Sequence, residues 1–234
     1  MNAPTFLDRA DAYLGAQLRD RAAPVPPPPF VTLSREAGAG GSTVARLLAR
    51  RLNGTAPPGE VWRVHEGNLT ARMLAANQLD PHVARFLPED RVPELAASIG
   101  ELVGLHPNLW NLVRKLNEHI RRLATAGHVI LVGRGASFAT AGLPNGLHVR
   151  LVAPAPQRAR RLAALYAIPE AHARDEVARR DAARRRYVRA TFDADIGEPS
   201  AYGLCINTAE LSFAQAADLI VERLGRGGAR ARAA

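Results

Sequence analysis

The chain has 234 residues, of which 47% are hydrophobic and 23% charged, with a formal net charge of +9. This composition is close to the average of soluble globular proteins, which excludes a wholly disordered chain. A single cysteine excludes an intrachain disulfide and a cysteine-cluster zinc site. The longest uninterrupted apolar run, at residues 128–132, is far shorter than the ~20 residues of a membrane span. Residues 1–10 lack the apolar core of a signal peptide, so we expect a cytoplasmic protein with no membrane partner.

Nearly all of the positive charge is arginine. Only one of the 31 basic residues is a lysine, Lys115, and residues 150–189 hold eleven arginines against four acidic residues. The planar guanidinium group binds phosphate oxygens through parallel hydrogen bonds. The arginine excess fits either a compositional bias of the whole chain or a contact with a polyanion, and both nucleic acid and nucleotide phosphates qualify.

The predicted elements alternate between strands and helices. An amphipathic helix at 3–22 and a proline-rich linker form an arm over residues 1–29. The expected strands span residues 30–34, 61–64, 128–132, 147–152 and 204–206. The expected helices span residues 42–52, 156–167, 169–190 and 214–224, with a mostly helical stretch at 68–125 and a disordered tail at 225–234. The alternation predicts an α/β layered fold with a five-stranded parallel sheet, which we expect to have its first strand at the centre.

A glycine-rich segment follows the first predicted strand and precedes the first helix of the sheet domain. Its glycines allow backbone N–H groups to approach an anion, and the helix start adds further N–H groups. The P-loop pattern G-x-x-x-x-G-K-[ST] fits this context but fails at two positions, since Arg35 replaces the first glycine and Gly41 the lysine. We predict a phosphate-binding loop over residues 38–43, against the alternative of a glycine-rich connection without a ligand.

A second short segment, Gly133-Arg134-Gly135, follows the third predicted strand. Because the carboxyl ends of parallel strands meet at one edge of the sheet, Arg134 can project into the same cleft as the glycine-rich loop. We interpret it as a second phosphate contact, with an exposed turn as the alternative.

Four segments, in the same order along the chain, resemble the cytidylate-kinase-like family of P-loop nucleoside monophosphate kinases. They are VTLSREAGAGGSTVARLLARRL, VILVGRGASFA, LHVRLVAPAPQRARRL and RRDAARRRYVRATFDADIGEPSAYGLCINTAEL. The resemblance covers about residues 30–224 and implies a P-loop NTPase-type three-layer fold. It also implies a helical monophosphate-binding insertion at 66–125, an arginine-rich lid at 170–200, and ATP-dependent phosphorylation of CMP or dCMP with magnesium.

The resemblance also implies roles for individual residues. The glycine-rich loop would hold the ATP phosphates, and Ser42 would lie beside magnesium. The loop residues expected to bind ATP are Gly38, Ala39, Gly40, Gly41, Ser42 and Thr43. Arg158 and Arg161 would flank the adenine side or join the lid. The residues expected to act on the transferring group or to close over both nucleotides are Arg35, Arg134, Arg180, Asp181 and Arg184.

Three departures from the family pattern keep other functions open. Gly41 lacks the lysine charge, which Arg35 or a lid arginine would have to replace. The family often has an acidic residue after the third strand, where this chain has Gly135. It often has another after the second strand, where this chain has His65, beside Glu66. Glu36 and Asp181 are then the candidates to support magnesium. These departures favour, as an alternative, a nucleotide-binding module with little or no turnover.

Two further interpretations concern partners and the cysteine. Nucleic-acid binding is favoured by charge alone, and the absence of aromatic residues between the arginines counts against it. Cys205 lies between Leu204 and Ile206 in a predicted strand, where we expect it to be buried and inert.

Overall fold

The computed structural model describes residues 27–66 and 107–232. The predicted helix at 3–22, almost all of the N-terminal arm and most of the predicted insertion at 66–125 lie outside these residues. Within the described part of the chain, no helix combines the length and apolarity that crossing a membrane requires.

Five strands form one sheet with the order β2-β3-β1-β4-β5, and every pairing is parallel. The strands are β1 (Phe30–Arg35), β2 (Arg63–Glu66), β3 (Val129–Val132), β4 (Gly146–Val152) and β5 (Leu204–Asn207). The first strand is therefore central, which confirms the predicted parallel sheet. All five carboxyl ends lie at one edge, where open α/β sheets bind their ligands.

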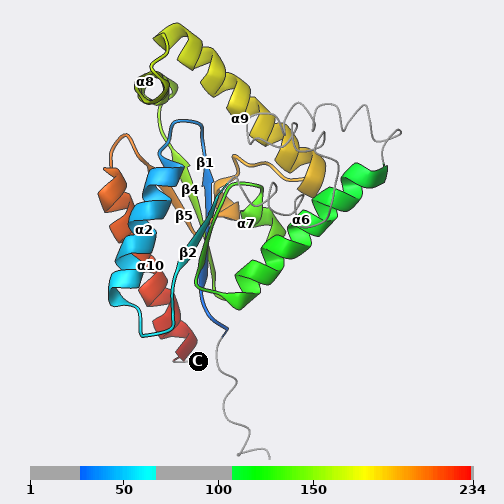
Figure 1. The fold of residues 1–234 in the computed structure, drawn as a ribbon, viewed down its shortest axis with the longest axis vertical. Coiled ribbons are helices and arrows are strands. Elements are labelled where there is room, and N and C mark those ends of the chain that lie inside the picture. The colour runs from blue at the N-terminus through cyan, green and yellow to red at the C-terminus, as the bar shows by residue number, and fades with distance from the viewer. Residues whose placement is uncertain (1–26, 67–106, 233–234) are drawn as a thin grey trace, which may run out of the picture.

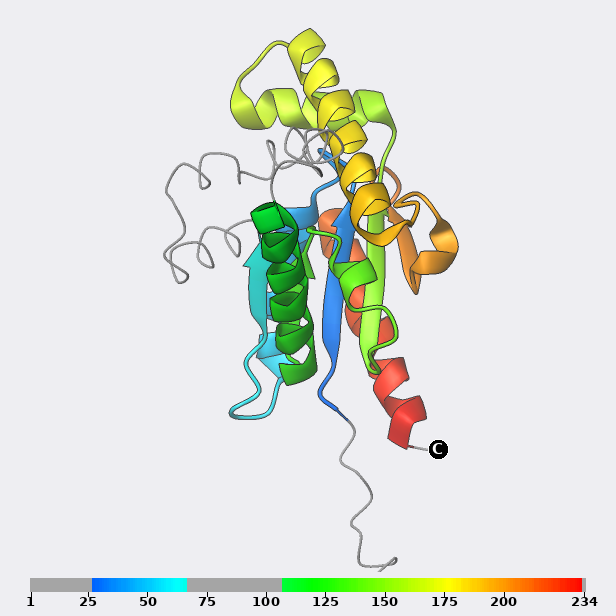
Figure 2. The ribbon, with the colours of Figure 1, turned by 90° about the vertical axis from the view of Figure 1, so that its right-hand side faces the viewer.

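Helices cover both faces of the sheet, which gives the predicted three layers (Figures 1 and 2). On one face lie α2 (Gly41–Thr55) and α10 (Phe213–Arg232), and on the other α6 (Pro107–Ala126) and the short α7 (Ala136–Ala139). The hairpin of α8 (Ala155–Tyr166) and α9 (Glu170–Phe192) extends past the carboxyl ends of the strands, at the top of both views. A 3₁₀ turn, η1 (Pro199–Ala201), precedes β5.

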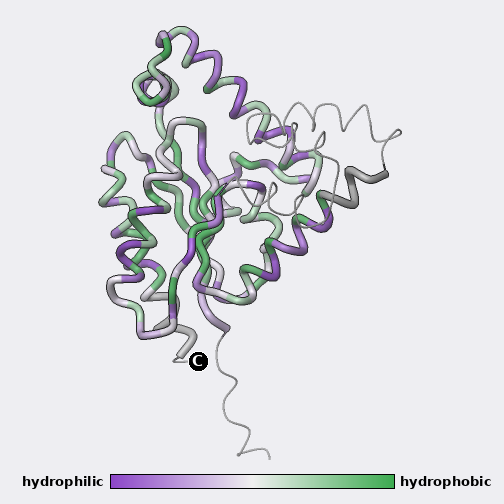
Figure 3. Tube along the Cα trace, in the orientation of Figure 1, coloured by the Kyte–Doolittle hydropathy of each residue, from purple (hydrophilic) through white to green (hydrophobic). Residues whose placement is uncertain are grey.

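The core has two halves because successive strand residues point to opposite faces. In β3, Ile130 and Val132 pack towards α2 and α10, while Val129 and Leu131 pack towards α6 and α7. Figure 3 shows the resulting concentration of hydrophobic residues in the strands and the hydrophilic character of α9. The sheet is thus a buried and rigid base for the loops at its carboxyl edge.

Two expectations from the sequence are wrong. The helix α10 continues to Arg232, so residues 225–232 are helical rather than a disordered tail. Cys205 is exposed rather than buried, because β5 is an edge strand and its core-facing residues are Leu204 and Ile206, on the other face.

Candidate active site

The loop between β1 and α2 has the backbone of an anion-binding turn. Gly38 and Gly40 have φ angles of 77° and 86°, in the left-handed region that glycine adopts readily. Gly40 is the N-cap of α2, and its carbonyl oxygen accepts the first helical hydrogen bond from Val44 N at 2.9 Å. The N–H groups of Gly41, Ser42 and Thr43 therefore have no partner within the helix, and they converge with the positive end of its dipole.

Neighbouring atoms also leave no room for a side chain in this loop. A Cβ atom on Gly38 would lie 2.6 Å from the carbonyl oxygen of Arg158, and one on Gly40 would lie 2.2 Å from the ring of Phe213. Both glycines are thus required by conformation and by packing, which explains this part of the sequence pattern.

The loop after β5 anchors the glycine loop from the other side. The Thr208 hydroxyl donates to Ala39 O at 3.1 Å, and Arg161 donates to Thr208 Oγ1 and O at 3.0 and 2.6 Å. The Arg161 guanidinium also lies 4.9 Å from the centre of the Phe213 ring, and burial lowers its pKa. Arg161 is thus held beside the glycine loop, on the side away from α7.

Ser42 is paired with a carboxylate that the sequence analysis did not select. Its hydroxyl donates a hydrogen bond to Glu66 Oε1, at the carboxyl end of β2. The acidic residue at this strand end is therefore Glu66, one position after His65, and the parallel pairing of β2 in the sheet puts it near the loop. A hydroxyl and a carboxylate are ligands that Mg²⁺ prefers, so this pair fits the predicted magnesium position.

Arg158 is enclosed by protein acceptors. Its Nε donates to Ala153 O at 2.6 Å and lies 3.2 Å from Glu36 Oε2, and its Nη1 donates to Ala37 O at 3.1 Å and Asp181 Oδ2 at 2.6 Å. Asp181 Oδ1 also accepts from Ala37 N at 2.7 Å. Glu36 and Asp181, the expected supports for magnesium, are thus both bonded to Arg158, and the group ties α9 to the glycine loop.

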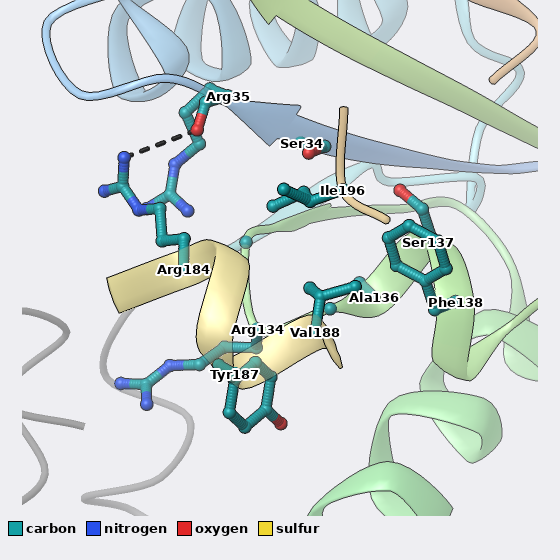
Figure 4. Close-up of a pocket in the computed structure, with 12 residues that line it drawn as sticks. Ser34, Arg35, Arg134, Ala136, Ser137, Phe138, Arg184, Tyr187, Val188 and Ile196 are labelled. Atoms are coloured by element: carbon teal, nitrogen blue, oxygen red, sulfur yellow. Dashed lines mark hydrogen bonds between the residues drawn. The ribbon is translucent and has the colours of Figure 1, made fainter. Parts of the chain in front are cut away.

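A pocket opens between the carboxyl ends of β1 and β3, the short helix α7 and helix α9 (Figure 4). No carboxylate occurs among the described residues that line it. They are Ser34, Arg35, Gly133, Arg134, Gly135, Ala136, Ser137, Phe138, Arg184, Tyr187, Val188 and Ile196. Since three of these residues are arginines, the pocket is suited to an anionic ligand.

The three arginines gather at one end of this pocket. Figure 4 shows the guanidinium groups of Arg35, Arg134 and Arg184 on its left, and Arg184 donates to Arg35 O at 3.3 Å. Burial, together with the charges of Arg184 and Arg134, lowers the pKa of Arg35 well below its usual value, although nearby Glu66 opposes this. Such mutual repulsion is relieved when an anion binds among the groups.

Arg134 takes an unusual backbone conformation. Its φ is 56°, in the left-handed region where a residue other than glycine is strained. Next to it, a Cβ atom on Gly135 would lie 2.4 Å from the ring of Phe192, so the acidic residue that the family resemblance suggested has no space here. The buried Tyr187 ring packs against Phe192, and its burial raises the pKa of the phenol.

Hydroxyl groups line the opposite end of the pocket, beside Phe138. Ser34 accepts from the buried Arg150 at 2.9 Å and from the Tyr202 hydroxyl at 3.2 Å. Ser137 shares a hydrogen bond of 2.8 Å with Thr32, which in turn contacts His148 Nδ1 at 2.9 Å. Neither serine was selected from the sequence, because a serine at a strand end carries no distinctive pattern.

The structure therefore brings together most of the predicted site residues, in three groups. The glycine loop with Ser42 and Thr43 forms one group, the pocket arginines form another, and Arg158 with Asp181 links them. Arg180 lies apart from the pocket lining, since it bonds Glu176 Oε1 at 2.6 Å and lies 5.4 Å from the centre of the Tyr166 ring.

Comparisons with known proteins show which chains this one is similar to. The model of the cytidylate kinase-like family matches residues 30–210. An uncharacterized protein from Eubacterium ventriosum has a similar fold, with a TM-score of 0.62 and 18% identity over 84% of this chain and 98% of that one. A shikimate kinase from Bacteroides thetaiotaomicron aligns with a TM-score of 0.46 and 17% identity over 85% of this chain and 98% of its own.

One curated relative also matches part of the chain. A uronate isomerase from Corynebacterium glutamicum is 28% identical over 97 residues, which is 42% of this chain. The match spans only 19% of the length of that isomerase.

Proposed function

The chain belongs to the cytidylate kinase-like family, and we propose that it transfers the γ-phosphoryl group of ATP to a nucleoside monophosphate, CMP or dCMP. Membership of this family supports a kinase-type phosphoryl transfer. The specific acceptor is our proposal, and it rests on the resemblance together with the chemistry of the pocket.

The observation that carries this proposal is that the glycine loop and an arginine-lined pocket share the end of β1. Arg35 is the last residue of β1 and lines the pocket, and the glycine loop begins three residues later at Gly38. ATP phosphates on the loop and an acceptor phosphate in the pocket would then be neighbours. Phosphoryl transfer requires mainly this kind of positioning and cationic stabilisation of the charge that develops.

Ser42 and Glu66 are the residues that would hold magnesium. When bound, the ion would neutralise charge on the phosphate oxygens of ATP and help to orient them. The N–H groups at the start of α2 would bind the same phosphates.

The pocket residues would bind and orient the acceptor. Arg134 and Arg184 would hold its phosphate through charge-assisted hydrogen bonds, and Phe138 with the hydroxyls of Ser34 and Ser137 would contact the nucleoside end. No general base is needed, because the attacking oxygen belongs to a phosphate that is already ionised at neutral pH. Arg161 and Phe213 would lie near the adenine side of ATP.

The test is a screen of nucleoside monophosphates with the purified full-length protein, ATP and magnesium, in which ADP release is followed. We expect release to depend on the acceptor and to be fastest with CMP or dCMP. Faster transfer to a purine monophosphate, or to a small phosphate-free alcohol, would contradict the proposed acceptor.

A nucleotide-binding module with little turnover is the second candidate function, and Gly41 at the lysine position is the observation that favours it. In that case the protein would bind ATP with magnesium in equilibrium titrations, and no acceptor in the screen would increase ADP release. Binding without transfer would therefore select this function over the kinase.

A further inference from the structure

The chain departs from the P-loop pattern at two positions, and the structure brings these two residues into contact. Arg35 stands where the pattern has its first glycine, and Gly41 stands where it has lysine. A Cβ atom on Gly41 would lie 2.8 Å from Cγ and 3.1 Å from Cδ of Arg35. The aliphatic part of Arg35 therefore fills the space through which a lysine side chain at position 41 would leave the helix.

Backbone conformation does not explain the glycine at position 41. Gly38 and Gly40 have positive φ angles, whereas the φ angle of Gly41, the first residue of α2, is not positive. The three atoms nearest to its hypothetical Cβ all belong to the Arg35 side chain. Gly41 is thus explained by the path of Arg35.

Arg35 is also held in position by its surroundings. It extends from the last residue of the central strand, is 8% exposed, and lines the pocket beside Arg184 and Arg134. Figure 4 shows its guanidinium group directed to the same end of the pocket as those two. A side chain fixed by packing in this way can present its charge at little entropic cost.

We propose that the two departures are one compensated exchange, in which Arg35 contributes from the end of β1 the cation that lysine contributes from position 41 of a standard P-loop. Its ligand is a phosphate group of the nucleotide on the glycine loop. The guanidinium fork binds two phosphate oxygens at once, whereas an ammonium group acts as a point charge. This inference rests on the proposed function, because it assigns the cation of the same site.

The test is a cycle of four proteins: the unchanged chain, Arg35→Gly, Gly41→Lys and the double variant. The double variant reads G-E-A-G-A-G-K-S over residues 35–42, which satisfies the P-loop pattern. We expect Arg35→Gly to lower turnover about 100-fold, as for loss of one charge-stabilising donor. Gly41→Lys should also lower it, because two side chains would compete for one space. The double variant should recover to within about tenfold of the unchanged chain, since contacting sites are not additive.

Each variant is also measured by thermal unfolding and by its affinity for ATP with magnesium. A Gly41→Lys variant that fails to fold, beside a double variant that folds, would equally support the exchange. A double variant no more active and no more stable than Gly41→Lys would overturn it. Lys115→Ala, at an exposed position of α6, is the control and should change neither readout.

The binding readout separates this inference from the proposed function. If the unchanged chain transfers phosphate to no acceptor, the proposed function fails. The exchange is then tested by ATP affinity, which the double variant should recover relative to the two single variants. If transfer occurs but the losses of the two single variants simply add, the function stands and the exchange is wrong.

Discussion

Arg158 and Arg134 both lie beyond the carboxyl edge of the sheet, but their surroundings differ. Arg158 contacts two carboxylates and two main-chain carbonyl groups, and it is 6% exposed. Arg134 stands on a strained turn at a pocket whose described lining contains no carboxylate. A buried cation enclosed by carboxylates and carbonyl groups of the protein contributes to folding, whereas a cation that lines a pocket together with other cations is arranged for an anionic ligand.

The largest expected effect is on the folding side of this comparison. Arg158→Met keeps most of the aliphatic length but leaves the Glu36 carboxylate without its cation and Asp181 with only the more distant Arg184, at 3.8 Å. We expect the free energy of unfolding to fall by about 3–5 kcal/mol, the usual loss when one partner of a buried pair is removed. Urea denaturation followed by circular dichroism measures this.

The matched control is Arg160→Met on the same helix, where the side chain is exposed. A surface substitution of this kind changes stability by about 0.5 kcal/mol or less. Equal losses of unfolding free energy for the two variants would show that the ion pairs and hydrogen bonds of Arg158 do not stabilise the fold.

Arg134→Gly tests the ligand side and should move activity and stability in opposite directions. Turnover should fall by ~100-fold or more, about 2.7 kcal/mol, because a preorganised cation is lost. Stability should rise by about 1 kcal/mol, because glycine removes the left-handed strain at φ 56°. Steady-state kinetics and thermal unfolding of the same preparation measure both.

Ala167→Gly is the control for the strain, since Ala167 ends α8 with a φ of 52° and lies outside the pocket lining. It should gain similar stability with unchanged turnover. Normal turnover of Arg134→Gly would show that Arg134 does not take part in the reaction.

Gly40→Val tests whether the glycine loop binds the nucleotide. Its side chain would collide with the Phe213 ring and block the approach of phosphate, so we expect ATP affinity to fall tenfold or more, about 1.4 kcal/mol. Isothermal titration of protein shown to be folded gives the affinity. Gly54→Val is the matched control at the other end of α2, where a Cβ atom would meet nothing within 4 Å, and its ATP affinity should be unchanged.

The smallest effect concerns the outer part of α9. Hydrogen bonds from Arg179 and Arg180 lower the pKa of Glu176 to about 2 from an ordinary value of 4.5. The stability that the ionised carboxylate contributes is therefore present above pH 4.5 and is lost as the pH falls towards 2. Glu176→Gln should cost about 1 kcal/mol or less at pH 7, because these pairs are partly exposed and screened by solvent.

The pH dependence distinguishes this ion pair from a packing effect. The difference in unfolding free energy between Glu176→Gln and the unchanged chain should shrink as the pH falls below 4.5. A difference that stays constant down to pH 2 would mean that the charge of Glu176 contributes nothing.

Patterns in the sequence were enough to predict the parallel sheet and the glycine loop. These features depend on local signals: apolar runs of strand length, helices between them, and glycines at a strand–helix junction. Arg134 could be selected in the same way, because it lies between two glycines directly after a strand. The exposure of Cys205 could not, because strand order decides which strand is the edge.

The partners of these residues could be identified only from the three-dimensional arrangement of the chain. The pairing of Ser42 with Glu66, the enclosure of Arg158 by Glu36 and Asp181, and the contact of Arg35 with Gly41 depend on side chains that meet in three dimensions. The first two join residues far apart in the chain, and the third depends on the direction that the Arg35 side chain takes from the end of β1 towards the start of α2. Charge and spacing along the chain predict a phosphate site here, but packing determines which arginines are enclosed by acceptors of the protein and which line the pocket.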